Sequence, residues 1–309
     1  MTTLAPPVVR GQEPTRSRGG RSGSVLVWMV LPAFIMFVFF GIVPLLGVIV
    51  LSFATWNGIT PEIELTGLTS WKAALTNPGL PNALWVTFLI MALSWLVQTP
   101  ISILLGTFMA RQSRYRGFLA VFYFIPLLLS SAAIAITYKS LLDPNFGLGA
   151  GLGIEALNQD WLGQANLAIA TLIFVVSWQF IPFHSLIYQG AVRQIPQSMY
   201  EAAQIDGAGR VRQFFNITLP QIKYTIITSS TLMVVGSLTF FDLIWVLTAG
   251  GPGDATRALA VQMYQLGFQA SLMGPASAIA VILVLVGIGL SLLLRRIGGR
   301  ADESQMEGV

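Results

Sequence analysis

The chain has 309 residues, of which 54% are apolar and only 10% are charged, and its net charge is +4. Soluble domains carry about 25% charged residues, so this composition excludes an ordinary soluble fold and predicts a protein that crosses a membrane several times. The absence of cysteine excludes disulfides, thiolate metal sites and cysteine nucleophiles, and one histidine makes a histidine-based metal cluster unexpected. The basic residues lie at the ends of apolar segments, so no nucleic-acid partner is expected.

The N-terminal tail, residues 1–24, is rich in Pro, Gly, Ser and Thr and carries four basic residues: Arg10, Arg16, Arg18 and Arg21. This composition predicts a disordered tail. The apolar segment that follows, near 25–54, is about twice as long as the apolar part of a signal peptide, so we expect it to remain in the protein as a membrane span. Because proline removes a helix hydrogen bond, Pro32 and Pro44 predict a tilted or kinked span.

Five further apolar segments can each cross a hydrocarbon core, which needs about 20 residues. They lie near 83–110, 117–138, 166–190, 222–248 and 275–294. Unpaired backbone groups are costly in lipid, so all six segments are predicted to be helices. The predicted fold is an all-α polytopic membrane protein whose six-helix domain occupies 25–294, followed by a tail at 295–309. The glycine-rich stretch 147–153 is predicted to be a flexible loop on the outer side.

Lysine and arginine predict the orientation, because both are enriched in cytoplasmic loops. Fourteen of the 17 basic residues fall in the two tails, in the 111–116 turn and in the loop between the fourth and fifth spans. Only Lys72, Lys139 and Arg257 fall on the other side. Both termini and the 191–222 loop are therefore predicted to be cytoplasmic.

The 191–222 loop contains a pattern that reads E-A-A, three residues, G, nine residues, I, one residue, L-P. Its positions are Glu201, Ala202, Ala203, Gly207, Ile217, Leu219 and Pro220. Residues 198–205 are good helix formers that Gly207 and Gly209 can end, which predicts a short helix after Pro196. The alanines would let another surface approach closely.

Two roles are open for this short helix. Glu201, near the predicted helix start, is favoured by the helix dipole, and Glu201 or Asp206 could pair with a partner's basic residue. Alternatively, the helix could lie on the lipid surface through its apolar residues, with Arg193 and Arg210 meeting anionic lipid.

The full pattern resembles the EAA loop of permease subunits in binding-protein-dependent ABC importers. Two longer stretches, 180–209 and 240–256, resemble the carbohydrate branch of these importers, of the glycerol-phosphate and maltose type. The resemblance covers most of the chain from the first span to Leu294 and implies a type I ABC importer permease fold. It also implies a bacterial or archaeal cytoplasmic membrane, and it implies that the short helix of the 191–222 loop docks on an ATPase subunit.

The resemblance implies several partners and no enzyme activity for this chain. The sequence has no G-x-x-x-x-G-K-[ST] phosphate loop, so ATP and Mg²⁺ belong to a separate ATPase dimer and no cofactor is expected here. The other implied partners are a second homologous permease, an extracytoplasmic solute-binding protein and the transported solute. A self-sufficient ion-coupled transporter would instead need inverted repeats and intramembrane charges, and the sequence offers one candidate charge and no clear repeat.

By the same resemblance, the solute lies midway across the membrane between the fourth and fifth spans. A sugar site needs aromatic faces and a few oriented polar groups. The candidate polar groups are Gln179, Ser237 and Thr239, and the candidate aromatic faces are Phe183, Phe240 and Phe241. For any single aromatic, packing against neighbouring helices is the competing interpretation, and His184 is interpreted as a core histidine.

Asp242 is the one carboxylate predicted to lie inside a span, where such groups are expensive and usually functional. It could line the solute path, face water or pair with a cation of the partner subunit. An unpaired carboxylate would repel an anion, so Asp242 favours a neutral sugar over a glycerol-phosphate-type solute.

Overall fold

The computed structural model describes residues 22–111 and 113–298. The chain divides into two compact units, 1–47 and 48–309. The predicted tails at 1–24 and 295–309 lie largely outside the described residues, except that residues 22–24 belong to the first helix and 295–298 to the last one.

The first unit contains a single helical path. It runs through α1 (Ser22–Phe37), a π-helical turn η1 (Val38–Ile42) and α2 (Val43–Leu51), which continues into the second unit. Pro44 has no N–H with which to continue the regular pattern, and the wide π turn directly precedes it. A π turn thus lies between the two prolines of this segment, and Pro32 is accommodated within α1.

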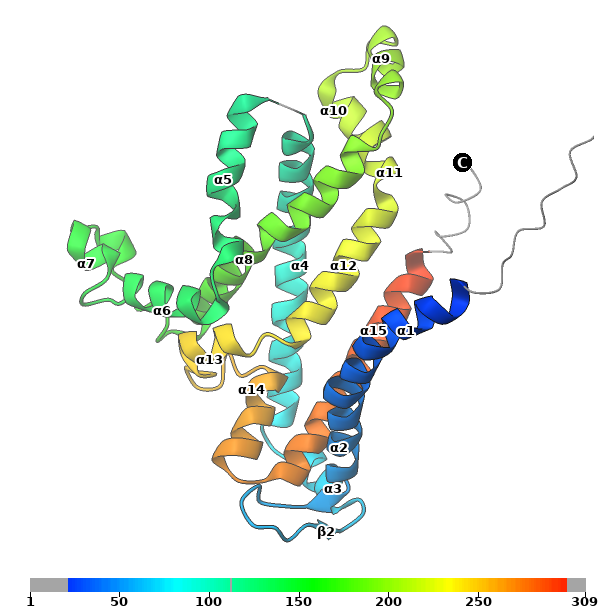
Figure 1. Cartoon of the computed structure of the whole chain (residues 1–309). Coiled ribbons are helices and arrows are strands. Elements are labelled where there is room, and N and C mark those ends of the chain that lie inside the picture. Colours follow the sequence, from blue (N-terminus) through cyan, green and yellow to red (C-terminus); the bar gives the residue numbers. More distant parts are fainter. Residues whose placement is uncertain (1–21, 112, 299–309) are drawn as a thin grey trace, which may run out of the picture. The chain divides into compact units, whose positions relative to one another are not determined.

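The second unit begins with a small layer of short elements, β1 (Ala54–Thr55), β2 (Glu64–Leu65) and α3 (Thr69–Leu75), seen at the lower end of Figure 1. The two strands are antiparallel, with Ala54 opposite Leu65. Ser70 Oγ donates to the Ala54 carbonyl at 2.6 Å and so ties α3 to this hairpin.

Four long helices form the centre of the second unit. They are α4 (Leu80–Ala110), α8 (Ala165–Arg193), α12 (Lys223–Leu238) and α15 (Met273–Gly298). α4 packs against α8 and α12, and α12 packs against α15. Gly106 lets α4 approach α8 closely, because a Cβ there would lie 2.7 Å from the Ser185 carbonyl oxygen. Small residues allow such backbone contact between membrane helices.

Two of the predicted spans are bent, so their prediction as continuous helices was wrong. The 117–138 segment forms α5 (Arg114–Leu128) and α6 (Ser131–Leu141), which meet at 97°. Ser130 starts α6 as its N-cap, accepting a hydrogen bond from the Ala133 N–H at 3.2 Å. The 222–248 segment forms α12 and α13 (Asp242–Thr248), which meet at 50° after α12 ends at Leu238.

The remaining elements lie in the connections. They are α7 (Leu148–Leu152), η2 (Glu155–Leu157), α9 (Gln197–Ile205), α10 (Arg210–Gln213), η3 (Phe214–Thr218), α11 (Leu219–Gln221), α14 (Leu259–Tyr264) and η4 (Gln265–Gln269). The glycine-rich stretch contains the one-turn helix α7 rather than a featureless loop. Gly149 is packed tightly there, since a Cβ would lie 2.6 Å from the Leu157 carbonyl carbon.

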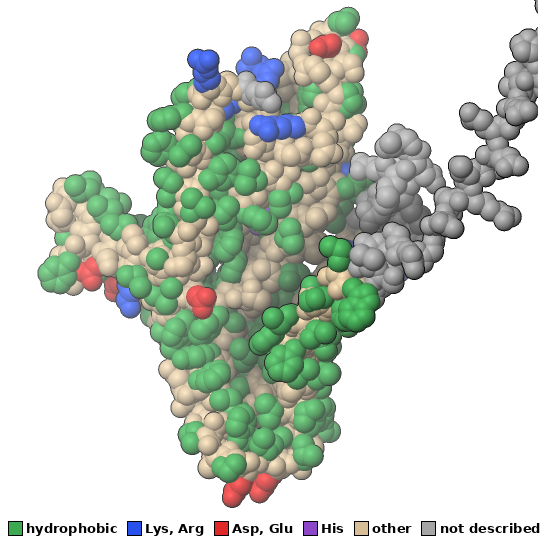
Figure 2. Space-filling model, viewed as in Figure 1, with side chains coloured by type: hydrophobic (Ala, Val, Ile, Leu, Met, Phe, Trp, Pro, Cys, Tyr) green, Lys and Arg blue, Asp and Glu red, His purple; other side chains and the backbone are tan. Residues whose placement is uncertain are grey.

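Four helices among the described residues are long and apolar enough to span a membrane: Trp28–Leu51, Leu80–Ala110, Ala165–Arg193 and Met273–Arg296. The total reaches six when each bent pair counts as one span. On the face of the second unit that Figure 2 shows, Lys and Arg side chains gather at the end where α5 begins and where α9 to α11 lie.

Candidate functional site

The 191–222 loop forms a short helix, α9, as its residues predict. Pro196 is the N-cap with φ −57°, and the helix ends before Gly207, whose φ is +74°. The N–H of Ala208 donates to the Ala203 carbonyl at 2.8 Å, and the N–H of Gly207 donates to Gln204 at 3.0 Å. This pair of bonds is the Schellman arrangement, in which a left-handed glycine satisfies the last carbonyls of a helix. Gly209 instead precedes α10 as its N-cap.

The pattern residues of the loop are mostly accessible. Of the seven, four are exposed and three are half-buried: Glu201, Ala202, Gly207 and Pro220, and then Ala203, Ile217 and Leu219. Asp206, which directly precedes Gly207, is also a predicted coupling residue and is exposed. Within the described chain, neither carboxylate of this set forms an ion pair. Glu201 is the fifth residue of the nine in α9 and lies beyond its first turn, so the predicted stabilisation by the helix dipole is corrected to a small effect.

The returning half of the loop is anchored to the long helices. Thr218 is buried, and its hydroxyl hydrogen-bonds that of Tyr200 at 2.9 Å, which joins α9 to η3. Leu219 packs against a buried cluster formed by Ile103 of α4, Tyr188 and Val192 of α8, and Ile222. α9 is therefore presented on an anchored stem, while none of its own residues is buried.

The bend between α12 and α13 brings aromatic side chains together. Phe240 stacks on Phe180 of α8 with ring centroids 5.3 Å apart. Phe241 stacks on Trp245 at 5.9 Å and meets Tyr264 of α14 at 4.8 Å. Trp245 and Tyr264 were not predicted to belong to the site, because the sequence indicated a span end and an outer loop at these positions.

The other residues predicted for the solute path have mixed surroundings. Ser237 is buried and donates to the Val234 carbonyl at 2.8 Å, whereas Thr239 is exposed and donates to Gly236 at 2.8 Å. Phe183 is partly exposed and meets His184 edge-on at 5.1 Å. Asp242 is exposed in the first turn of α13. It directly follows the break between α12 and α13.

Gln179 links α8 to the bend between α5 and α6. Its side chain is buried, and Nε2 donates to Ser131 Oγ at the start of α6 at 3.1 Å. Its Oε1 has no hydrogen-bond partner within the described residues. Phe180, the next residue of α8, stacks on Phe240, so both bends meet the same stretch of α8.

Buried polar contacts connect the long helices to one another. These contacts lie in the stretch between the bends and the 191–222 loop. His184 Nδ1 lies 2.9 Å from Ser229 Oγ of α12, which confirms the prediction of a hydrogen-bonded core histidine. Trp95 Nε1 of α4 donates to Ser230 Oγ at 2.8 Å. The Trp95 contact has no local sequence signal, since its partners are 135 positions apart.

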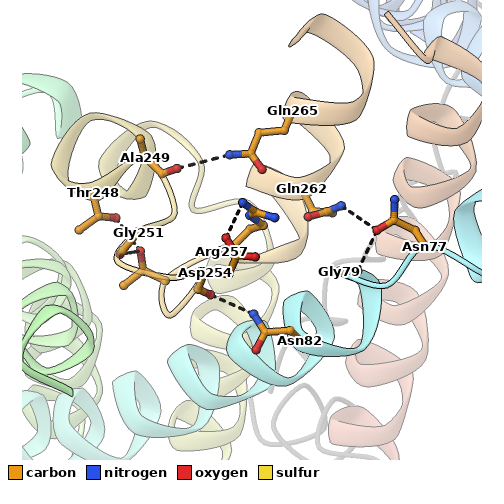
Figure 3. Close-up of polar contacts among 11 residues, drawn as sticks. Asn77, Gly79, Asn82, Thr248, Ala249, Gly251, Asp254, Arg257, Gln262 and Gln265 are labelled. Carbon is orange, nitrogen blue, oxygen red and sulfur yellow. Dashed lines mark hydrogen bonds and ion pairs between the residues drawn. The ribbon is translucent and has the colours of Figure 1, made fainter. Parts of the chain in front are cut away.

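The turn between α13 and α14 is held by a network of polar contacts (Figure 3). Asp254 pairs with Arg257, and its carbonyl accepts a hydrogen bond from Asn82 Nδ2 of α4 at 2.9 Å. Gln262 Nε2 donates to Asn77 Oδ1 at 3.2 Å. Gly250, Gly251 and Pro252 lie in this turn, which is thus fastened to the start of α4.

The chain is similar in sequence to a family of membrane transport proteins and to permeases of known transport systems. Residues 98–302 match the family of the binding-protein-dependent transport system inner membrane component. The multiple sugar-binding transport system permease protein MsmF of Streptococcus mutans is 31% identical, over 84% of this chain and 90% of its own length. The arabinooligosaccharides transport system permease protein AraP of Bacillus subtilis is 27% identical over 87% and 86%.

A crystal structure of a bacterial ABC transporter that imports alginate, an acidic polysaccharide, has a similar fold. The similarity has a TM-score of 0.78 at 24% identity and covers 91% of this chain and 96% of that one. With the family match over 98–302, the chain therefore belongs to the inner membrane components of binding-protein-dependent transport systems and has the type I permease fold of ABC importers.

Proposed function

We propose that this chain is the permease subunit of an ABC importer that moves a neutral sugar or short oligosaccharide across the cytoplasmic membrane. The observation that carries the proposal is α9, an exposed helix with the complete E-A-A and glycine pattern on a stem anchored to α4 and α8. An ATPase dimer that docks on α9 would rotate the ends of α8 and α12 together, and the importer would also contain a second permease and a solute-binding protein. MsmF and AraP are named for the transport of multiple sugars and of arabinooligosaccharides, which supports a carbohydrate as the solute.

The proposal includes six spans with both termini in the cytoplasm. Each bent pair then counts as one span, with the bends toward the outer half of the membrane. The exposed basic residues near α9 support this orientation: Arg111, Arg114, Arg193, Arg210, Arg212 and Lys223. Cytoplasmic loops are enriched in such residues.

The solute path is proposed to pass the bends beside α8. Aromatic faces of Phe240 and Phe241 and the hydroxyl of Thr239 are the kinds of group that bind a sugar ring and its hydroxyls. The unpartnered Oε1 of Gln179 is a further acceptor nearby. Asp242 supports a neutral rather than anionic solute.

Replacing Glu201 with alanine tests the docking role. The substitution leaves the fold intact because Glu201 is exposed and has no ion pair among the described residues. We expect the affinity for the ATPase subunit to fall about tenfold, or about 1.4 kcal/mol, since an interface charge would lose its partner. The measurement is co-purification of the ATPase from detergent-solubilised membranes. Asn216→Ala, at an exposed non-pattern position of the same loop, is the control, and unchanged docking of both variants would contradict the role.

Replacing Asp242 with asparagine tests the solute path with little change in shape. Asp242 is exposed, so we expect assembly with the partner subunits to be unchanged and the KM for uptake to change severalfold. Uptake is compared with that of Glu62→Gln, which alters an exposed carboxylate of the β1–β2 loop. Loss of assembly in Asp242→Asn alone would instead make the carboxylate structural.

A further inference from the structure

A groove lies between α8 and α12 at the ends of these helices that are far from the bends. It has a volume of about 650 Å³ and is walled by α8 from Leu186 onward and by the beginning of α12 up to Thr228. Ile195 and Pro196, which lead into α9, also line it, as does Gln221, which ends α11. The groove therefore adjoins both ends of the loop that carries α9.

The lining of this groove is mixed: about half of it is apolar, and the polar half carries no charged side chain. Its polar members are two amides, one phenol and two threonine hydroxyls: Gln194, Gln221, Tyr224, Thr225 and Thr228. Among the described residues, the side chains of Gln194 and Thr225 have no hydrogen-bond partner, so their polar groups remain available to a ligand. The groove between α12 and α15 differs, because Val235, Leu283 and other apolar side chains dominate its lining.

Gly190 provides the room in the middle of the groove. It lies within α8, and a Cβ added there would meet no atom within 4 Å. The space beside Gly190 is open, so a larger side chain at this position would fill the groove without displacing the backbone.

A polar contact separates this groove from the bends. His184 and Ser229 join α8 to α12 directly beyond the groove residues of each helix. Thr228 and Thr239 lie roughly 16 Å apart along α12 at 1.5 Å per residue, so the groove and the bend are separate places on the same two helices.

We infer that this groove is a second, inner binding site for the transported solute, taking a neutral polyhydroxylated molecule before its release. The inference rests on the proposed function. Uncharged amide and hydroxyl groups suit sugar hydroxyls, whereas lipid chains would leave them unpaired. Since the groove adjoins both ends of the α9 loop, movement of α9 would change its width.

The test compares Gly190→Leu with Gly289→Leu. Gly289 of α15 is a helical glycine that also has open space around its Cβ, so both variants should fold. The complete complex is expressed in cells, and the probe is the neutral sugar whose uptake is lost when this chain is deleted. We expect Gly190→Leu to retain the ATPase and second permease but to lower uptake by about tenfold or more, because leucine occupies the site. Gly289→Leu should transport normally.

A thiol measurement identifies what occupies the groove. The chain has no cysteine, so Thr228→Cys can be modified selectively by a charged methanethiosulfonate reagent applied to inside-out vesicles. We expect rapid modification that the same sugar slows. Leu104→Cys on α4 should not be modified, because Leu104 is exposed on an apolar face that lipid would cover in the membrane, where a charged reagent does not enter. An unreactive Thr228→Cys would mean that lipid or the second permease covers the groove, and normal uptake by Gly190→Leu would equally overturn the inference. If deletion of the chain affects the uptake of no sugar, the proposed function fails instead.

Discussion

Replacing Gly106 with leucine is expected to prevent the chain from folding in the membrane. A Cβ at this position would lie 2.7 Å from the Ser185 carbonyl oxygen and 2.8 Å from the Cβ of Tyr188. These atoms belong to the α8 backbone and to a fully buried side chain, so they cannot move without separating α4 from α8. Overpacking typically costs about 1–3 kcal/mol, and a clash with backbone exceeds that range.

The measurement is the yield of monodisperse protein after detergent extraction, together with its thermal unfolding temperature. Gly117→Leu on α5 is the matched control, because a Cβ at Gly117 would meet no atom within 4 Å. A normal yield of Gly106→Leu would show that α4 and α8 are farther apart than in this structure.

Replacing Ala202 with arginine is expected to uncouple the chain from its ATPase while leaving the chain itself intact. Ala202 is exposed on α9, so a large side chain has room in the isolated subunit. In a docked complex it would hold the two surfaces apart, and an effect of about 2 kcal/mol, roughly thirtyfold in affinity, is typical of a central interface position. Co-purification of the ATPase and uptake should both fall.

Ala202→Ser is the control at the same position, since a hydroxyl adds little volume. It should bind the ATPase normally. If Ala202→Arg also binds the ATPase normally, α9 does not form the close contact that we propose, and the alternative of a helix on the lipid surface gains support.

The long helices were predictable because length and hydropathy decide them. The segments 83–110, 166–190 and 275–294 correspond to α4, α8 and α15 within a few residues. The bends were not predicted, because average hydropathy is the same for a straight span and a broken one. Local signals were present, however: Ser130 is a helix N-cap, and Asp242 lies in the first turn of α13.

The candidate site also has a part that the sequence predicts and a part that it does not. α9 follows from local chemistry, namely helix formers ended by Gly207, and the structure confirms it. The contacts of the solute path depend on tertiary packing, as with Phe180 on Phe240 or Gln179 on Ser131, which no spacing along the chain encodes. Gly149 illustrates the same limit, since its role is close packing against Leu157 rather than backbone freedom.

The lack of any buried residue in α9 separates the folding of this chain from the coupling to an ATPase that we propose. Exposed substitutions away from special backbone positions usually change the free energy of unfolding by less than about 0.5 kcal/mol. Damage to the exposed face of α9 would therefore escape screens for expression level or thermal stability, whereas damage at Gly106 would be found by both. If α9 docks on an ATPase as proposed, natural variation along it should be constrained by that second molecule and hardly at all by the stability of the permease.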